Sequence, residues 1–146
     1  MCLVIKDGTA KQRTETNILV YKCLDYDVFT KTYCTPFQYM PIDFDNDGIV
    51  KLFHNSLFNS EVSEADLLVV KRGFHAYRDF VSALEMSEKY PRCGTKPHKA
   101  IIPKYSLYYV GSNGDIVADK MIIFEDEYFY NNFIEKYNIT PTELEF

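Results

Sequence analysis

The residues of this chain best suited to bind a ligand lie in the segment 73–77 (GFHAY). In a β-strand, His75 and Tyr77 face one side because they are two residues apart, and Phe74 and Ala76 face the other. An imidazole can exchange a proton near neutral pH, and a phenol ring can stack on a flat ligand. We therefore expect His75 and Tyr77 to face a pocket and Phe74 and Ala76 to face the core.

Two lysines on other apolar segments complete the expected pocket. Tyr21 and Lys22 are neighbours in the segment 17–24, so only one of them can share the pocket face. We expect this to be Lys22, because Tyr21 has the larger apolar area to bury. Lys120, in the segment 115–124, is expected to approach from another strand. Together the candidate binding residues would suit an anionic ligand with a flat base. They are Tyr21, Lys22, His75, Tyr77 and Lys120.

Other motifs point less clearly to chemistry. Residues 43–48 (DFDNDG) match the start of a calcium-binding loop, but its twelfth position is His54 instead of a bidentate glutamate. We interpret this segment as an acidic turn. The three histidines are far apart in the sequence and do not indicate a metal site. We expect His54 and His98 at the surface and His75 in an apolar strand.

The four cysteines, Cys2, Cys23, Cys34 and Cys93, are widely spaced and form no C-x-x-C motif, which argues against a structural zinc site. The first residues lack the apolar region of a signal peptide, so we expect a reducing, cytoplasmic setting and free thiols. Removal of Met1 would leave Cys2 as an N-terminal nucleophile. The absence of a glycine after it makes this a minor alternative.

Composition narrows the class of protein. The 146 residues are 47% hydrophobic and 25% charged, which is typical of one ordered globular domain, residues 1–146. No apolar run reaches the ~18 residues of a membrane helix. The net charge of −5 argues against a dedicated nucleic-acid-binding protein, which usually carries a basic surface.

The pattern of apolar residues and turns predicts an α+β fold with a mainly antiparallel, curved sheet. An irregular segment, 1–16, is expected before the first core strand, and its short apolar run, 2–5, is a candidate edge strand. Residues 78–89 predict a central helix that buries Phe80, Val81, Leu84 and Met86, and residues 126–137 predict a closing helix. The spacing of 140–143 predicts one further helical turn within the C-terminal segment 126–146. The predicted strands are 17–24, 31–35, 49–53, 67–71, 73–77, 98–103, 106–110 and 115–124.

The order of several segments resembles that of small uncharacterised proteins of bacteriophages and prophages, which also tend to open with Met-Cys-Leu. The segments are 20–24 (VYKCL), 73–77 leading into the helix through Ala83, and 100–104 (AIIPK) followed by Tyr108, Tyr109 and 116–123. The resemblance covers residues 1–124. It implies an accessory protein that works in the cytoplasm of a bacterial host.

The same order resembles, more remotely, an ADP-ribosyltransferase core, whose final strand carries a catalytic glutamate. Lys120 stands where this glutamate is expected, and Lys22 replaces the usual arginine or histidine of the early strand. Asp119 is one residue away and so faces the other side of a strand. These departures argue against transferase activity, although a pocket of this kind would still bind a nucleotide.

Three functions stay open from the sequence. The first is a non-catalytic protein that needs no cofactor and sequesters a nucleotide-derived, immune-signal ligand to counter host defence. The second is an ADP-ribosyltransferase-like or nucleotide-processing enzyme with Asp119 or Glu125 as its acid. The third is an inhibitor that binds a host defence protein through an acidic surface. That surface would comprise Asp43, Asp45, Asp47, Glu125, Asp126 and Glu127. A homo-oligomer is compatible with each of the three functions.

Overall fold

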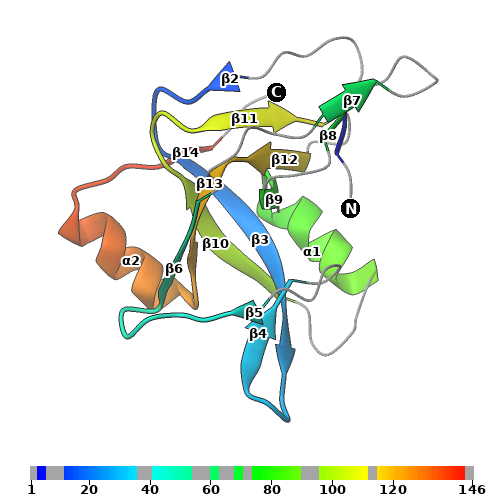
Figure 1. The fold of residues 1–146 in the computed structure, drawn as a ribbon. Coiled ribbons are helices and arrows are strands. Elements are labelled where there is room, and N and C mark those ends of the chain that lie inside the picture. The colour runs from blue at the N-terminus through cyan, green and yellow to red at the C-terminus, as the bar shows by residue number, and fades with distance from the viewer. Residues whose placement is uncertain are drawn as a thin grey trace.

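The chain has an α+β fold in which a large, mainly antiparallel sheet carries two helices, as predicted (Figure 1). The helices of the described residues are α1 (Phe80–Lys89) and α2 (Glu127–Lys136). The structure is a computed structural model that describes residues 3–5, 12–35, 41–53, 60–62, 68–70, 74–89, 96–111 and 115–143.

The large sheet is built around β3, the longest strand. Along the sheet the strands follow the order β2 (Gln12–Arg13), β11 (Leu107–Val110), β12 (Asp115–Ala118), β9 (Phe74–Tyr77), β3 (Ile18–Asp27), β10 (Lys96–Ile102), β13 (Lys120–Phe124) and β6 (Ile49–Phe53). Shorter strands extend it: β4 (Thr32–Cys34), β5 (Pro41–Ile42) and β14 (Thr142–Glu143). A separate three-stranded sheet contains β1 (Leu3–Ile5), β8 (Leu68–Val70) and β7 (Ser60–Val62).

Both faces of the large sheet are buried, which explains the nearly continuous apolar character of β3. Ile18, Val20 and Leu24 belong to one hydrophobic cluster, and Leu19 and Tyr21 belong to another. The first cluster combines residues of β6, near one edge of the sheet, with residues of β11 and β12 near the other. Strands so far apart in the sheet can share a cluster only if the sheet curves, as the sequence pattern predicts.

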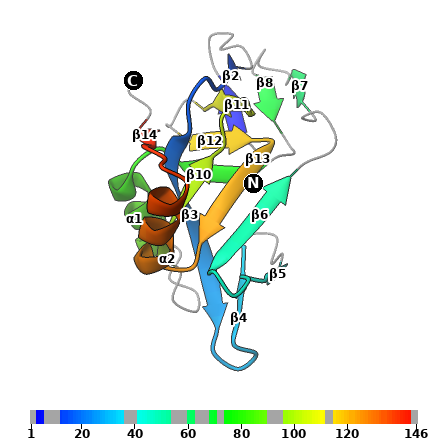
Figure 2. The ribbon, with the colours of Figure 1, turned by 90° about the vertical axis from the view of Figure 1, so that its left-hand side faces the viewer.

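Both helices lie on the side of the second cluster, as Figure 2 shows. Asp126 caps α2 by accepting a hydrogen bond from the Phe129 N–H, and Asp79 accepts one from the Ser82 N–H at the start of α1. The predicted closing helix is therefore confirmed nearly to the residue. It buries Tyr130 against Phe124 of β13, with the ring centroids 5.3 Å apart.

The predicted buried face of α1 is wrong for three of its four residues, and Met86 alone of the four packs, partly buried, against the second cluster. Phe80, Val81 and Leu84 are exposed, whereas Ala83 and Ser87 are buried. The reason is a close approach between helix and sheet, in which the thiol of Cys23 on β3 donates a hydrogen bond to the Ala83 carbonyl at 3.3 Å. Only small side chains fit between two backbones that are this close.

Three further segments differ from the sequence-based expectation. Residues 115–124 form two strands instead of one, because the chain bends at Asp119. Segment 1–16 contains β1, where an edge strand was a candidate, and also β2, which was not expected. The helical turn predicted at 140–143 is absent. Instead, β14 runs parallel to β3, and the Thr142 N–H donates to the Asn17 carbonyl at 2.9 Å. Backbone groups at the start of β3 thereby gain partners that one turn of helix would leave unpaired.

Candidate functional site

The five predicted site residues do not assemble into one pocket. Tyr21 and Tyr77 are direct partners in the register of β3 and β9, so both face the side that carries the helices. The expectation that Lys22 shares a face with Tyr77 is therefore wrong, and Tyr21 takes that place. As expected, Ala76 packs on the other side, in the first cluster with Phe74 against it. Tyr77 itself is buried in the second cluster.

Lys22 and His75 form a separate polar pair inside the protein. The Lys22 Nζ donates a hydrogen bond to the backbone carbonyl of His75 at 2.7 Å. Burial lowers the pKa of Lys22 to about 8 and that of His75 to about 4. The Nε2 atom of His75 is buried, and no described residue hydrogen-bonds to it. Neither Lys22 nor His75 lines the cleft that is described below.

Lys120 lies far from Tyr21 along the sheet. It starts β13 and pairs with Phe53 of β6, whereas Phe124, at the other end of β13, is the residue next to α2. A separation of four residues along a strand is about 13 Å. The neighbouring Asp119 accepts a hydrogen bond from the Leu107 N–H at 2.9 Å, so its carboxylate closes the bend between β12 and β13.

The structure instead has a cleft of about 740 Å³ that is lined by residues of β3, β4, β10 and the two helices and of the segment before α2. Figure 1 shows β3 and β10 running between the two helices toward the β3–β4 hairpin. The volume is within the range of about 300–1,000 Å³ that is usual for small-molecule sites. Among the described residues, Tyr21 alone of the five predicted binding residues lines the cleft, together with the predicted acidic residues Glu125, Asp126 and Glu127. The described residues of the lining are Tyr21, Leu24, Tyr26, Val28, Tyr33, Phe80, Lys96, Pro97, His98, Lys99, Glu125, Asp126 and Glu127.

The cleft exists because β10 and β13 separate. The two strands pair at Ala100 and Ile101, and β13 then ends at Phe124, where the chain turns toward α2. At this point the His98 side chain replaces the strand pairing. Its Nδ1 atom lies 2.9 Å from the Glu125 carbonyl oxygen and 3.2 Å from that of Phe124. His98 thus holds the start of α2 beside the open edge of β10.

One side of the cleft is an aromatic wall, which we define as Tyr26, Tyr33 and His98. Tyr26 and Tyr33 are cross-strand partners in the β3–β4 hairpin, with ring centroids 4.8 Å apart. The Tyr33 ring meets the His98 ring edge to face at 5.5 Å. Behind this wall, Phe44 stacks on His98 at 6.3 Å and contacts Tyr33 at 5.1 Å. These contacts fix the ring orientations before any ligand arrives.

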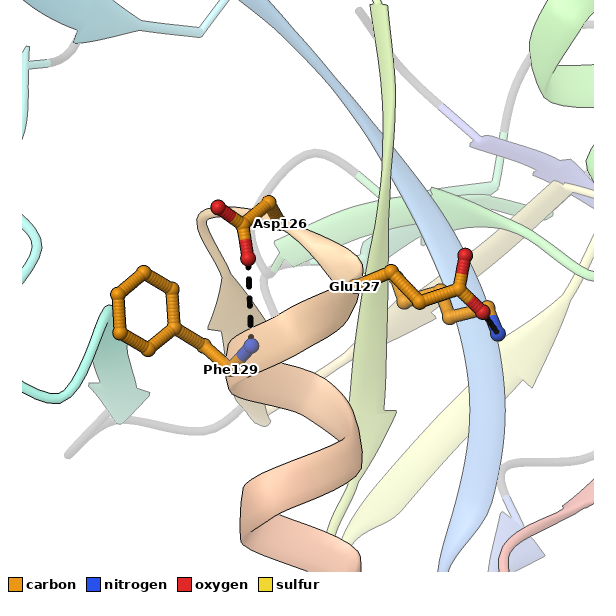
Figure 3. A network of polar contacts seen from close by, with 4 residues as sticks. Asp126, Glu127 and Phe129 are labelled. Atoms are coloured by element: carbon orange, nitrogen blue, oxygen red, sulfur yellow. Dashed lines mark hydrogen bonds and ion pairs between the residues drawn. The ribbon is translucent and has the colours of Figure 1, made fainter.

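The lining also contains an acidic wall, which we define as Glu125, Asp126 and Glu127 and which adjoins the aromatic wall where His98 meets the Glu125 carbonyl. Asp126 is turned back toward its own helix, where it caps the Phe129 N–H, and Glu127 extends over β10 and β3 (Figure 3). Glu127 forms an ion pair with Lys99 at 2.7 Å, and the Lys99 Nζ also lies 4.6 Å from the centre of the Tyr130 ring. Lys96 is the second cation among the described lining residues, which thus carry three carboxylates and two ammonium groups.

The electrostatics of the cleft follow from this arrangement. Burial lowers the pKa of His98, although its two carbonyl partners act in the opposite direction, so the ring is neutral at pH 7. Burial and the nearby Glu125 raise the pKa of Tyr33. Burial alone would lower the pKa of Lys99, but its hydrogen bond and ion pair with Glu127 outweigh burial and raise it. All three side chains therefore hold one protonation state near pH 7.

The expectation that His98 is exposed is wrong, because its ring is partly buried between Phe44 and the start of α2. His54 lies outside the described residues. The acidic turn at 43–48 is confirmed: Asp45 accepts hydrogen bonds from the Asp47 and Ile49 N–H groups. The Gly48 carbonyl accepts one from the Glu125 N–H at 2.9 Å, so this turn adjoins the acidic wall.

Comparison with known proteins gives no relative of this chain: no family model, no curated protein and no solved structure matches it. Within the described ranges, no group of three or more His, Cys, Asp and Glu side chains is placed to hold a metal ion. Neither α1 nor α2, the helices that the structure describes, is long and apolar enough to cross a membrane. The absence of disulfides stays a prediction, because Cys2 and Cys93 lie outside the described residues.

Proposed function

We propose that this protein is a non-catalytic binding protein whose cleft holds the flat, nitrogen-rich ring of a nucleotide-derived ligand. The observation that carries this proposal is the prearranged aromatic wall in a cleft that hydrogen-bonding carboxylates also line. A base that stacks on such a wall gains about 1–3 kcal/mol. The rings already pack on one another and on Phe44, so little ordering is required on binding.

The hydrogen-bonding groups of the cleft favour a ring with N–H donors. Both partners of the His98 Nδ1 atom are carbonyl oxygens, so Nδ1 carries the hydrogen. The neutral ring then leaves Nε2 as an acceptor. Glu125 adds carboxylate oxygens, which also only accept. Nucleobases and related heterocycles with amino or imino groups present matching donors.

The charges favour a ligand with few phosphates. In the part of the lining that the structure describes, three carboxylates outnumber two lysines, and Lys99 is already paired with Glu127. A triphosphate would therefore meet net repulsion, whereas Lys96 can neutralise a single phosphate. A nucleoside, a nucleoside monophosphate or a compact signalling nucleotide fits better than a nucleoside triphosphate.

Sequestration requires binding without turnover. The carboxylate of Asp119, one of the two expected acids, is engaged by Leu107, and Lys120 lies at the far end of β13. The remaining acid, Glu125, lines the cleft, where it serves as an acceptor in this proposal. In a bacteriophage setting, a protein of this kind would lower the concentration of a nucleotide signal on which a host defence depends.

Calorimetric titration with nucleosides, their monophosphates and their triphosphates tests this proposal. We expect Tyr26→Ala to weaken binding at least about tenfold through lost stacking. Tyr128→Ala is the matched control, because Tyr128 is an exposed tyrosine of α2 outside the cleft lining. His98→Asn keeps a donor near the Nδ1 position and loses the acceptor at Nε2, so it should also weaken binding, and His98→Gln should restore part of it.

Two results would overturn the proposal. One is that no nucleoside or monophosphate binds the wild-type chain. The other is that Tyr26→Ala and Tyr128→Ala bind the same ligand equally well, which would place the ligand away from the aromatic wall.

A further inference from the structure

The tip of the β3–β4 hairpin, residues 28–31, presents a large apolar side chain on a fixed backbone. Phe29 is 95% exposed and Val28 is 66% exposed. The Asp27 Oδ1 atom accepts hydrogen bonds from the N–H groups of Phe29, at 2.9 Å, and Thr30, at 3.4 Å. The hydroxyls of Thr30 and Thr32 lie 2.7 Å apart. An aromatic side chain that is uncovered but held in place has the properties of a binding anchor.

The tip adjoins the cleft, because Val28 belongs to both. We propose that two copies of this chain associate through their hairpin tips, so that Phe29 of each copy enters the cleft of the other. In such a two-fold arrangement, both copies use the same surface, which consists of the hairpin tip and the cleft. The tip of each copy enters the cleft of the other. The hairpin projects from the rest of the molecule, which allows it to reach a second copy (Figure 1, Figure 2).

The chemistry of the tip matches that of the cleft. The paired rings Tyr21–Phe80, 5.8 Å apart, and Tyr26–Tyr33, 4.8 Å apart, give a phenyl group aromatic neighbours on two sides. Lys31 is exposed at the tip and brings a positive charge toward a lining in which carboxylates outnumber ammonium groups. Association would also cover the exposed Phe80 ring at the border of the cleft.

This arrangement makes the cleft self-occluding. A copy whose cleft holds the partner's Phe29 cannot hold a flat ligand in the same space, so the ligand would shift the population toward monomers. This consequence rests on the proposed function, whereas the dimer itself does not.

Sedimentation velocity between micromolar and millimolar concentration tests the dimer. We expect the wild-type chain to self-associate and Phe29→Ser to weaken association at least about tenfold. Val81→Ser is the matched control, because Val81 is an apolar residue of α1 that is 62% exposed and does not line the cleft. Lys31→Glu should also weaken association, because it removes the positive charge that faces the partner's carboxylates. Adding Glu125→Lys should restore association, because the charges at the tip and in the cleft are then both reversed.

A wild-type chain that stays monomeric at millimolar concentration would overturn the inference, as would equal effects of Phe29→Ser and Val81→Ser. Both substitutions change exposed side chains, so equal urea midpoints will exclude misfolding as the cause. Nucleoside titration of the monomeric Phe29→Ser variant separates the two proposals. If the wild-type chain binds the ligand but never dimerises, only the dimer is refuted. If it dimerises but no variant binds a ligand, only the proposed function is refuted.

Discussion

At the scale of single residues, Lys22 is the clearest case of a group that costs stability. Its side chain shares a face of β3 with Val20 and Leu24, and its Nζ is bonded to the His75 carbonyl. Burial holds its pKa at about 8 in the folded protein. The folded state therefore binds this proton less tightly than the unfolded chain, whose lysine has a pKa of about 10.4. The resulting penalty is complete below pH 8 and disappears as the pH rises toward 10.

We accordingly predict that Lys22→Met stabilises the protein by about 1–3 kcal/mol near pH 7. Methionine keeps the length of the side chain and removes the buried charge, at the cost of one hydrogen bond. Urea unfolding at pH 7 and again near pH 9.5 measures the effect, and the difference between variant and wild type should shrink at the higher pH. A loss of stability at pH 7 would mean that the bond to His75 outweighs the burial of the charge.

Lys22 also shows why the sequence did not predict which residue of β3 borders the cleft. The alternation of Tyr21 and Lys22 was sufficient to place them on opposite faces, but the choice between them assumed that only one face of β3 is buried. Both faces are buried, so Tyr21 can pack in a core cluster and still border the cleft. The interior position of Lys22 follows from strand order and register, which depend on the whole fold.

At the scale of elements, the contact between the acidic turn and α2 holds the two segments together. Gly48 has a positive φ of 66°, and a Cβ at this position would overlap the Phe129 ring. Gly48→Ala should therefore destabilise the protein by about 2–4 kcal/mol, through backbone strain and overpacking. Urea unfolding checks this value.

The Phe129→Ala variant provides the control for Gly48→Ala, because it lacks the ring that the new Cβ would overlap. In that background, Gly48→Ala should cost only the backbone strain of about 1 kcal/mol. Equal costs in both backgrounds would show that the ring does not determine the effect and that the turn conformation alone does.

Local patterns predicted the elements better than they predicted the cleft. Strands β4 and β6 and helix α2 follow from local runs, turns and caps, and they appear where predicted. The cleft depends on the separation of β10 from β13 and on the reach of the β3–β4 hairpin, neither of which has a local signature. The acidic run 125–127 was recognised as an acidic surface, but nothing in the sequence placed it beside aromatic residues of the β3–β4 hairpin.

At the scale of the whole molecule, the buried histidines and the surface carboxylates set how stability depends on pH in two separate windows. Burial lowers the pKa of His75 to about 4 and also lowers that of His98, so both rings are neutral in the folded protein at pH 7. Hydrogen bonds from backbone N–H groups lower the pKa values of Asp27 and Asp79. Protonation of these two carboxylates affects stability only below pH 4, where their unfolded forms titrate.

We predict that the free energy of unfolding falls as the pH decreases from 6.5 to 4.5, before the aspartates contribute. Unfolded histidines take up protons below pH 6.5, whereas the folded His75 does so only near pH 4, and its share approaches about 3 kcal/mol at the lower limit. Asp115 acts in the opposite direction, because burial raises its pKa and acid relieves its buried charge. Urea unfolding across this window should show a smaller decrease for His75→Leu than for wild type. If both decrease equally, the acid sensitivity originates elsewhere and the His75 ring takes up its proton in the folded state without cost.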